Sequence, residues 1–297
     1  MNTIFFDAHI SDDHRRQQLY DGQLFVYAPT PSSLKLIELA RRLIAEAFGD
    51  LDPEKAQYHM SVDEYAAVLS ELKPNFIHHP AAKQFIPGIL TELECDLART
   101  YFDVPRLRTA TSDNYLTTGI SYAFHPHRDT WYSAPQCQLN WWIPVFELES
   151  GRSMAFHPRY FSEPVRNSSH PYNYEEWNQK SRYTASQHVG TDTRVQPKPE
   201  EAIELEPQIR VVTVPGGVLV FSGAQLHSTV PNDTGRTRFS IDFRTVHIDD
   251  VAMMRGARNV DSECSGTTMN DYLRASDLTH IPPHVVALHD RRREVSK

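Results

Sequence analysis

The sequence of 297 residues predicts a mainly β fold, a sandwich or a barrel, with helices concentrated before it. In the first hundred residues, apolar side chains recur at three- and four-residue spacing, as amphipathic helices require. After Pro105, short segments rich in aromatic and β-branched residues alternate with Gly, Pro, Asn and Asp. We expect one domain over 1–297: mostly helical support in 1–104, the core in 105–247 and a C-terminal cover in 248–297.

Three helices are expected in the N-terminal part. The first runs from Ser33 to Phe48, where leucine, isoleucine and alanine follow a helical period. A second is expected over 61–72, because its first residues form a capping box and Pro74 follows its end. A third apolar run over 81–102 has the same period, with a break or kink at Pro87.

Short strands are expected in the following half of the chain, at 106–118, 119–125, 136–146, 152–157, 201–205, 209–214, 217–222 and 236–247. Segment 158–200 has no sustained period, yet it contains six aromatic residues. An insert of this length in a compact domain is often a binding lid, and its aromatic residues indicate packing rather than a disordered excursion.

Composition and charge narrow the class of partner. A formal charge of −8 argues against nucleic acid, since phosphate binding needs a basic face. A small-molecule substrate is expected instead, and a local arginine cluster can still bind an anion. Three scattered cysteines and no CxxC spacing argue for a reducing cytoplasm. We expect a soluble cytoplasmic protein with no signal peptide and no membrane partner; the oligomeric state is left open.

A candidate metal centre lies in the predicted core. His127 and Asp129 are two residues apart, so a strand would place both side chains on one face. An imidazole and a carboxylate are two ligands of the facial triad that binds non-heme iron(II). His227, which follows a buried apolar segment and a turn, is the third candidate. His125 also forms an HxH pair with His127, a pattern that suits zinc or a cupin-like metal site.

A carboxylate clamp is expected near this centre. Arg238 lies 238 − 227 = 11 residues after His227, and Ser240 shares its face on a strand. A guanidinium fork and a hydroxyl suit the distal carboxylate of a cosubstrate such as 2-oxoglutarate. Arg236 and Arg244 have the same parity, so the choice among the three arginines stays open.

These motifs resemble those of the iron(II)/2-oxoglutarate-dependent oxygenases, and within them the phytanoyl-CoA dioxygenase-like branch. The resemblance spans roughly residues 105–247 and rests on His127-Arg-Asp129, Gly151–Phe161, Pro215–Phe221, His227 with Pro231-Asn232, and Arg238-Phe-Ser240. The second of these departs from the family, whose stretch ends in Pro-Gly-Ser-His where this chain reads His157-Pro-Arg-Tyr.

The resemblance implies a double-stranded β-helix (jelly roll) core buttressed by helices, with iron(II) at its mouth. It also implies the use of 2-oxoglutarate and O2, release of succinate and CO2, and hydroxylation of a small metabolite, as in natural-product biosynthesis. Asp129 fills the place that halogenating members leave free, which favours hydroxylation; desaturation and cyclisation stay open. The alternatives are a cupin-like isomerase or dioxygenase without 2-oxoglutarate, and a binding module without catalysis.

Further residues are expected around the metal. Asn140 shares a strand face with Trp142, and either lines the cosubstrate pocket or belongs to the core. Arg128, between the two ligands, should face away from the metal. The residues expected to contact substrate are His125, Trp131, Tyr132 and, on the lid, Arg182.

Overall fold

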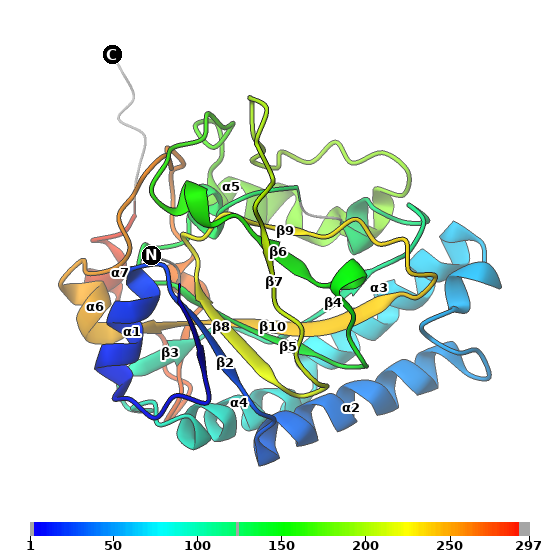
Figure 1. Cartoon of the computed structure of the whole chain (residues 1–297), viewed down its shortest axis with the longest axis horizontal. Helices are drawn as coiled ribbons and strands as arrows, with labels where there is room; N and C mark the ends of the chain where they lie inside the picture. Colours follow the sequence, from blue (N-terminus) through cyan, green and yellow to red (C-terminus); the bar gives the residue numbers. More distant parts are fainter. Residues whose placement is uncertain (1–2, 123–124, 291–297) are drawn as a thin grey trace.

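Two β-sheets face each other in the computed structural model, which describes residues 3–122 and 125–290 (Figure 1). The large sheet has eight strands in the order β1-β2-β8-β5-β10-β3-β11, with β4 paired to β10. Its strands are β1 (Ile4–Phe6), β2 (Leu24–Tyr27), β3 (Thr100–Phe102), β4 (Arg106–Ala110), β5 (Leu139–Pro144), β8 (Val218–Ser222), β10 (Arg238–His247) and β11 (Leu273–Arg274). The small sheet has the order β7-β6-β9, with β6 (Met154–Phe156), β7 (Ile209–Arg210) and β9 (His227–Thr229).

The chain passes back and forth between the two sheets. It runs through β4 in the large sheet, a bridge from His127 to His227 beside the small sheet, and then β5 in the large sheet. It continues through β6 and β7 of the small sheet, β8 of the large, β9 of the small and β10 of the large. An apolar cluster joins the facing sides: Leu24, Val26, Trp142, Phe156, Val211, Leu219 and Phe221. The predicted metal ligands therefore lie at one end of this two-sheet interior.

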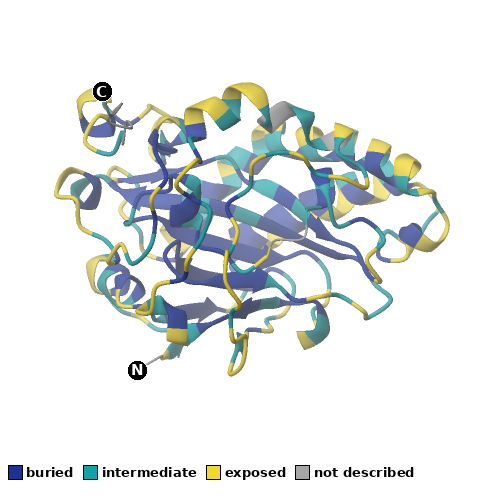
Figure 2. Cartoon of the chain, turned by 90° about the horizontal axis from the view of Figure 1, so that it is seen from above, coloured by how far each residue is buried: buried dark blue, intermediate teal, exposed yellow. Residues whose placement is uncertain are grey.

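Helices cover the outer face of the large sheet: α2 (Pro31–Phe48), α3 (Val62–His78) and α4 (Pro80–Glu92) (Figure 1). Strand alternation explains the division, because Trp141 and Ile143 of β5 point into the helix-side core while Trp142 points to the small sheet. Buried residues fill both interfaces, and exposed ones follow the outer sides of the helices (Figure 2). The shorter helices are α1 (Asp12–Tyr20), α5 (Tyr174–Lys180), α6 (Ile248–Ala252) and α7 (Pro283–Val286).

The expected helices form, with different ends. A capping box at Thr30 opens α2, and Ser61 with Glu64 opens α3 as predicted. The expected stop before Pro74 is wrong, because α3 continues to His78. A proline inside a helix removes one backbone hydrogen bond, and burial of Phe76 beyond it offsets that loss.

The third expected helix is shorter than its apolar period indicated: α4 ends at Glu92, and its last expected residues form β3. Strands form within six of the eight expected segments, but 106–118 keeps only β4, 152–157 keeps only β6 and 209–214 keeps only the two residues of β7. The segment 201–205 forms no strand, and 119–125 contains a 3₁₀ turn at Gly119–Ser121 and reaches residues outside the described part. The sequence prediction missed β1, β2, β9 and β11.

The "mainly β" expectation is also wrong in its proportions, since helical residues outnumber strand residues in the described chain. The insert 158–200 is packed as expected: Tyr160, Tyr172 and Tyr174 are buried, and α5 lies within it. Within 3–122 and 125–290, no helix combines the length and the apolar character needed to cross a bilayer.

Candidate metal centre

His127, Asp129 and His227 lie together at the mouth between the two sheets. Asp129 Oδ1 is 3.5 Å from His127 Nε2 and 3.9 Å from His227 Nε2. The two histidines are bridge partners, each backbone N–H donating to the other's carbonyl at 2.9 and 3.0 Å. Asp129 opens a 3₁₀ turn (Asp129–Tyr132) rather than continuing a strand, which corrects the expected local structure. Its backbone N–H donates to the carbonyl of Gly223 at 2.9 Å, which fixes the turn beside β9.

The histidine tautomers suit a metal. Nδ1 of His127 lies 2.8 Å from the carbonyl oxygen of His125, and Nδ1 of His227 lies 3.0 Å from that of Gln225. Because a carbonyl oxygen only accepts, each Nδ1 carries a proton, and each Nε2 faces Asp129. Burial, together with the nearby His127, lowers the pKa of His227 to about 4, so its ring is neutral at pH 7. Two imidazoles and one carboxylate fit a divalent iron.

Two side-chain amides donate to the other carboxylate oxygen of Asp129, Oδ2. Gln138 Nε2 and Asn140 Nδ2 donate to Asp129 Oδ2 at 2.8 and 2.9 Å. Tyr272 Oη donates to Gln138 Oε1 at 2.7 Å and so fixes that amide. Burial raises the pKa of Asp129, but the two histidines and Arg244 outweigh it and hold the pKa below its usual range.

This arrangement locates Asn140 more closely than the sequence did, because its amide supports a ligand from the floor of the site. The sequence analysis missed Gln138 and Tyr272. Gln138 shares the parity of Asn140, and this spacing was a usable signal. Tyr272 comes from the C-terminal cover, where nothing local marks it.

Arg128 points away from the metal centre, as expected, into a buried network. Its Nε donates to both carboxylate oxygens of Asp261, at 3.0 and 3.1 Å. The other nitrogens donate to carbonyls of Ala224, Tyr160 and Glu163. The side chain of Trp131 is fully buried, and its Nε1 donates to Asp261 at 2.7 Å; its expected substrate role stays a prediction.

Arg238 is buried in the interior between the sheets. Its Nη1 donates to the carbonyls of Arg152 and Ser153 at 3.1 and 2.9 Å, and its guanidinium lies 5.7 Å from the ring centre of Trp142. Arg238 Nε and Ser240 Oγ are buried without a hydrogen-bond partner in the described part of the chain. Burial and the nearby Arg152 lower the pKa of Arg238 to about 10, so the guanidinium is still charged at pH 7.

The two other candidate arginines lie elsewhere. Arg236 is 43% exposed and paired with Glu54 at 3.1 Å, outside the interior. Arg244 lies at the opposite end of β10, directly across from Asn140. The buried unpaired donors of Arg238 and Ser240 therefore remain the better match to a carboxylate clamp.

Comparison with known proteins gives similar structures but no sequence relative. No protein-family model and no curated protein matches the chain. EvdO2 from Micromonospora carbonacea var. aurantiaca, complexed with 2-oxoglutarate, is 14% identical, covers 81% of this chain and 93% of its own, and has a TM-score of 0.43. The epimerase SnoN from nogalamycin biosynthesis, in complex with Fe3+, α-ketoglutarate and nogalamycin RO, is 13% identical, covers 80% and 85%, and has a TM-score of 0.40.

SnoK, a non-heme α-ketoglutarate-dependent carbocyclase from nogalamycin biosynthesis, is 10% identical, covers 81% and 85%, and has a TM-score of 0.39. The enzyme class that the motifs resemble recurs among these structures. At TM-scores below 0.5 the similarities establish no detail of this site, whose chemistry follows from its own geometry.

The side of the centre facing the insert 158–200 is aromatic. Tyr132 meets His127 edge-on at 5.5 Å and Tyr172 at 5.4 Å, and its hydroxyl donates to the carbonyl of Pro197. His125 is exposed, and its carbonyl rather than its ring contacts His127. The side chain of Arg182 lies outside the described residues. The substrate roles of Tyr132, His125 and Arg182 therefore stay predictions.

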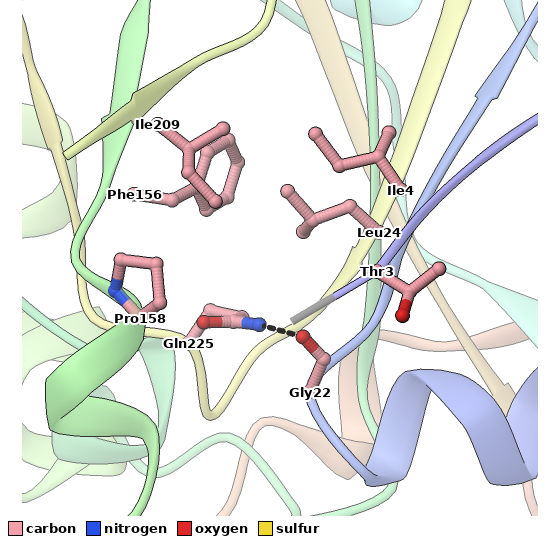
Figure 3. Close-up of a pocket in the computed structure, with 8 residues that line it drawn as sticks. All are labelled: Thr3, Ile4, Gly22, Leu24, Phe156, Pro158, Ile209 and Gln225. Carbon is pink, nitrogen blue, oxygen red and sulfur yellow. Dashed lines mark hydrogen bonds between the residues drawn. The ribbon is translucent and has the colours of Figure 1, made fainter. Parts of the chain in front are cut away.

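A small pocket lies between β1 and β2 of the large sheet and β6 and β7 of the small sheet (Figure 3). Phe156 and Gln225 line it, and Gln225 Nε2 donates across it to the carbonyl of Gly22. Phe156 also stacks near the His227 ring at 6.2 Å. None of the three ligand candidates lines this pocket, so the pocket is separate from the candidate metal centre.

Proposed function

We propose that this protein is an iron(II)- and 2-oxoglutarate-dependent oxygenase that hydroxylates a small molecule. The observation that carries the proposal is the combination of a three-ligand centre with a buried arginine that has no carboxylate partner in the described chain. A buried charge without a counter-ion is costly, so its persistence indicates a ligand that supplies the missing charge.

His127, Asp129 and His227 would hold the iron and leave coordination positions open for other ligands. When bound, iron(II) with 2-oxoglutarate and O2 supplies the oxidising power for the reaction. The amides of Gln138 and Asn140 keep Asp129 oriented, which preserves the ligand geometry.

Arg238 and Ser240 would bind the distal carboxylate of 2-oxoglutarate, with Arg238 Nε and Ser240 Oγ as the donors that lack a partner. The distance is suitable. Arg238 donates to the carbonyl of Ser153. Ser153 lies three residues before Phe156, and Phe156 is paired with His227 across β6 and β9. Three residues of strand span about 10 Å, which a five-carbon dicarboxylate and the flanking side chains can bridge.

The alternation of the chain between two facing sheets supports the jelly-roll core implied by the sequence resemblance. We assign residues 1–297 to one oxygenase domain with the insert 158–200 as its lid. The cupin-like alternative needs His125 as a ligand. His125 is exposed. Among the described residues, the possible metal ligands that lie together are His127, Asp129 and His227, and His125 does not belong to this group.

The test is anaerobic addition of iron(II) and 2-oxoglutarate, followed by the visible charge-transfer absorption of the chelate. Wild type should show the band, and His127→Ala should lose it. Arg238→Gln should need far more 2-oxoglutarate, roughly 10- to 100-fold, because a charge-assisted fork is lost. The matched control is Arg236→Gln, which removes an exposed arginine two residues away and should leave the titration unchanged. Iron binding without a band would overturn the proposal and favour the cupin-like alternative.

A further inference from the structure

The inner face of β4 and β10 carries excess positive charge beside the metal centre. Arg106, Arg108 and Arg244 form this arginine cluster, together with Asp103 and Asp242. The register pairs Asp242 with Arg106 and, on the other side, with Trp142, whose side chain lies between the two sheets. Directly opposed residues share a face of the sheet, so the cluster lies on the face that is turned toward the small sheet. Three arginines against two aspartates leave one positive charge over.

The hydrogen bonds show which arginine holds that excess. Arg108 forks onto both oxygens of Asp242, with Nε at 2.5 Å and Nη2 at 3.3 Å. Arg106 donates to Asp103 Oδ2, and the backbone N–H of Arg244 donates to Asp103 Oδ1 at 2.7 Å. Both carboxylates are therefore occupied. The Arg244 guanidinium comes no closer than 3.5 Å to Asp103, and within the described residues it makes no hydrogen bond.

Arg244 is adjacent to the metal ligands. It lies directly across from Asn140, whose amide donates to Asp129 Oδ2 at 2.9 Å. Opposed side chains start about 5 Å apart, so the guanidinium reaches the surroundings of Asp129. Its side chain is 19% exposed, so it is only partly buried. Burial lowers the pKa of Arg244, but the carboxylates of Asp103 and Asp129 outweigh that effect, and the group stays charged.

Arg244 and Arg238 serve different ligands. They are six residues apart on β10, about 20 Å along the strand, so both cannot fork onto the same carboxylate. Arg238 is buried between the sheets, whereas the Arg244 side chain is partly exposed and lies opposite Asn140, whose amide donates to Asp129.

We propose that Arg244 binds a carboxylate of the primary substrate, which makes that substrate a small carboxylic acid. The proposal rests on the proposed oxygenase function and adds the substrate class. A carboxylate matches the planar fork of Arg244. A dianionic phosphate fits less well, because Asp103 and Asp242 already offset two of the three arginine charges and leave only one.

The test measures binding and needs no turnover. Protein loaded anaerobically with iron(II) and 2-oxoglutarate is titrated by calorimetry with paired probes: benzoate and benzamide, phenylacetate and phenylacetamide, and N-acetyl amino acids with their amides. Wild type should bind at least one acid more tightly than its amide. Arg244→Gln should lose that preference, roughly 10- to 100-fold. Arg244→Lys should keep part of it, because the charge remains without the fork.

Arg236→Gln is the matched control, because it removes an exposed arginine near the same strand that pairs with Glu54 and takes no part in the cluster; the acid preference should persist. The proposal is overturned if no acid binds wild type more tightly than its amide, or if Arg244→Gln keeps the preference. It is also overturned if Arg244→Gln weakens 2-oxoglutarate binding instead, since Arg244 would then serve the cosubstrate. Failure of the oxygenase proposal is recognised separately, by the absence of the chelate band in wild type before any probe is added.

Discussion

The carboxylate of Asp261 joins the segment around Asp129 to the insert 158–200, and its removal gives a testable loss of stability. It accepts from Arg128 Nε, from Trp131 Nε1 and, at 2.9 Å, from the backbone N–H of Val165 at the start of the insert. The side chains of Arg128 and Asp261 are 2% and 5% exposed. Removing one partner of a buried ion pair costs about 3–5 kcal/mol, because the remaining charge stays buried.

We expect Asp261→Ala to lose about 4 kcal/mol of unfolding free energy, because the Arg128 charge stays buried without its carboxylate. The three carbonyls that still accept from Arg128 keep the loss below the upper end of that range. Unfolding entropy of about 2.1 cal/mol/K per residue, over 297 residues, converts this loss into a fall in Tm of about 6 °C. Calorimetry or urea unfolding of the metal-free protein measures it.

The matched control for this prediction is Asp249→Ala. Asp249 pairs with Arg99 on the surface, where the side chains are 34% and 56% exposed, so the loss should stay below about 1 kcal/mol. If Asp261→Ala unfolds within about 1 kcal/mol of wild type, the buried network does not hold the lid to the ligand segment, and the reasoning is refuted.

Three further changes are predicted. Asn140→Ala should weaken iron binding roughly 10- to 100-fold in a metal titration, because Asp129 loses a donor that orients it; unchanged affinity would contradict this role. Arg238→Met should lose little or no stability in urea unfolding, since no carboxylate in the described chain pairs with Arg238, whereas Arg128→Met should lose about 3 kcal/mol; equal losses would argue against the distinction. Burial lowers the pKa of Lys73 from 10.5 to about 7, so between these values the unfolded chain binds more protons and wild-type stability rises with pH. The stability of Lys73→Met relative to wild type should therefore fall from pH 7 to pH 10, by on the order of 2 kcal/mol, and a constant difference would be inconsistent with that titration.

The ligand set was predictable because its signals are local. His127 and Asp129 are two residues apart, and His227 follows a buried strand and a turn. Neither signal depends on a strand at Asp129, and the triad assembles although that residue opens a 3₁₀ turn. The prediction of the three residues held although the local structure was wrong, because β9 and the bridge at His127 position both histidines by backbone hydrogen bonds.

Other features depended on distant partners, and no local pattern gave them. Tyr272 reaches Gln138 across 134 residues of sequence, and the prediction could not place it. The continuation of α3 through Pro74 depends on burial of Phe76, which outweighs a local breaker. The short run that forms β2 is fully buried, and its antiparallel pairing with β8 spans almost two hundred residues.

The interior arginines show why sequence alone could not divide structural from functional groups here. Arg128 lies between two ligands and has a buried carboxylate partner, so its charge is satisfied within the fold. Arg238 has only carbonyls, and Arg244 shares an aspartate already occupied by Arg106. Because a buried or half-buried charge is stable only with its full set of partners, the incomplete sets mark where ligands belong. Two incomplete sets, about 20 Å apart along β10, therefore argue for two different anions around one metal.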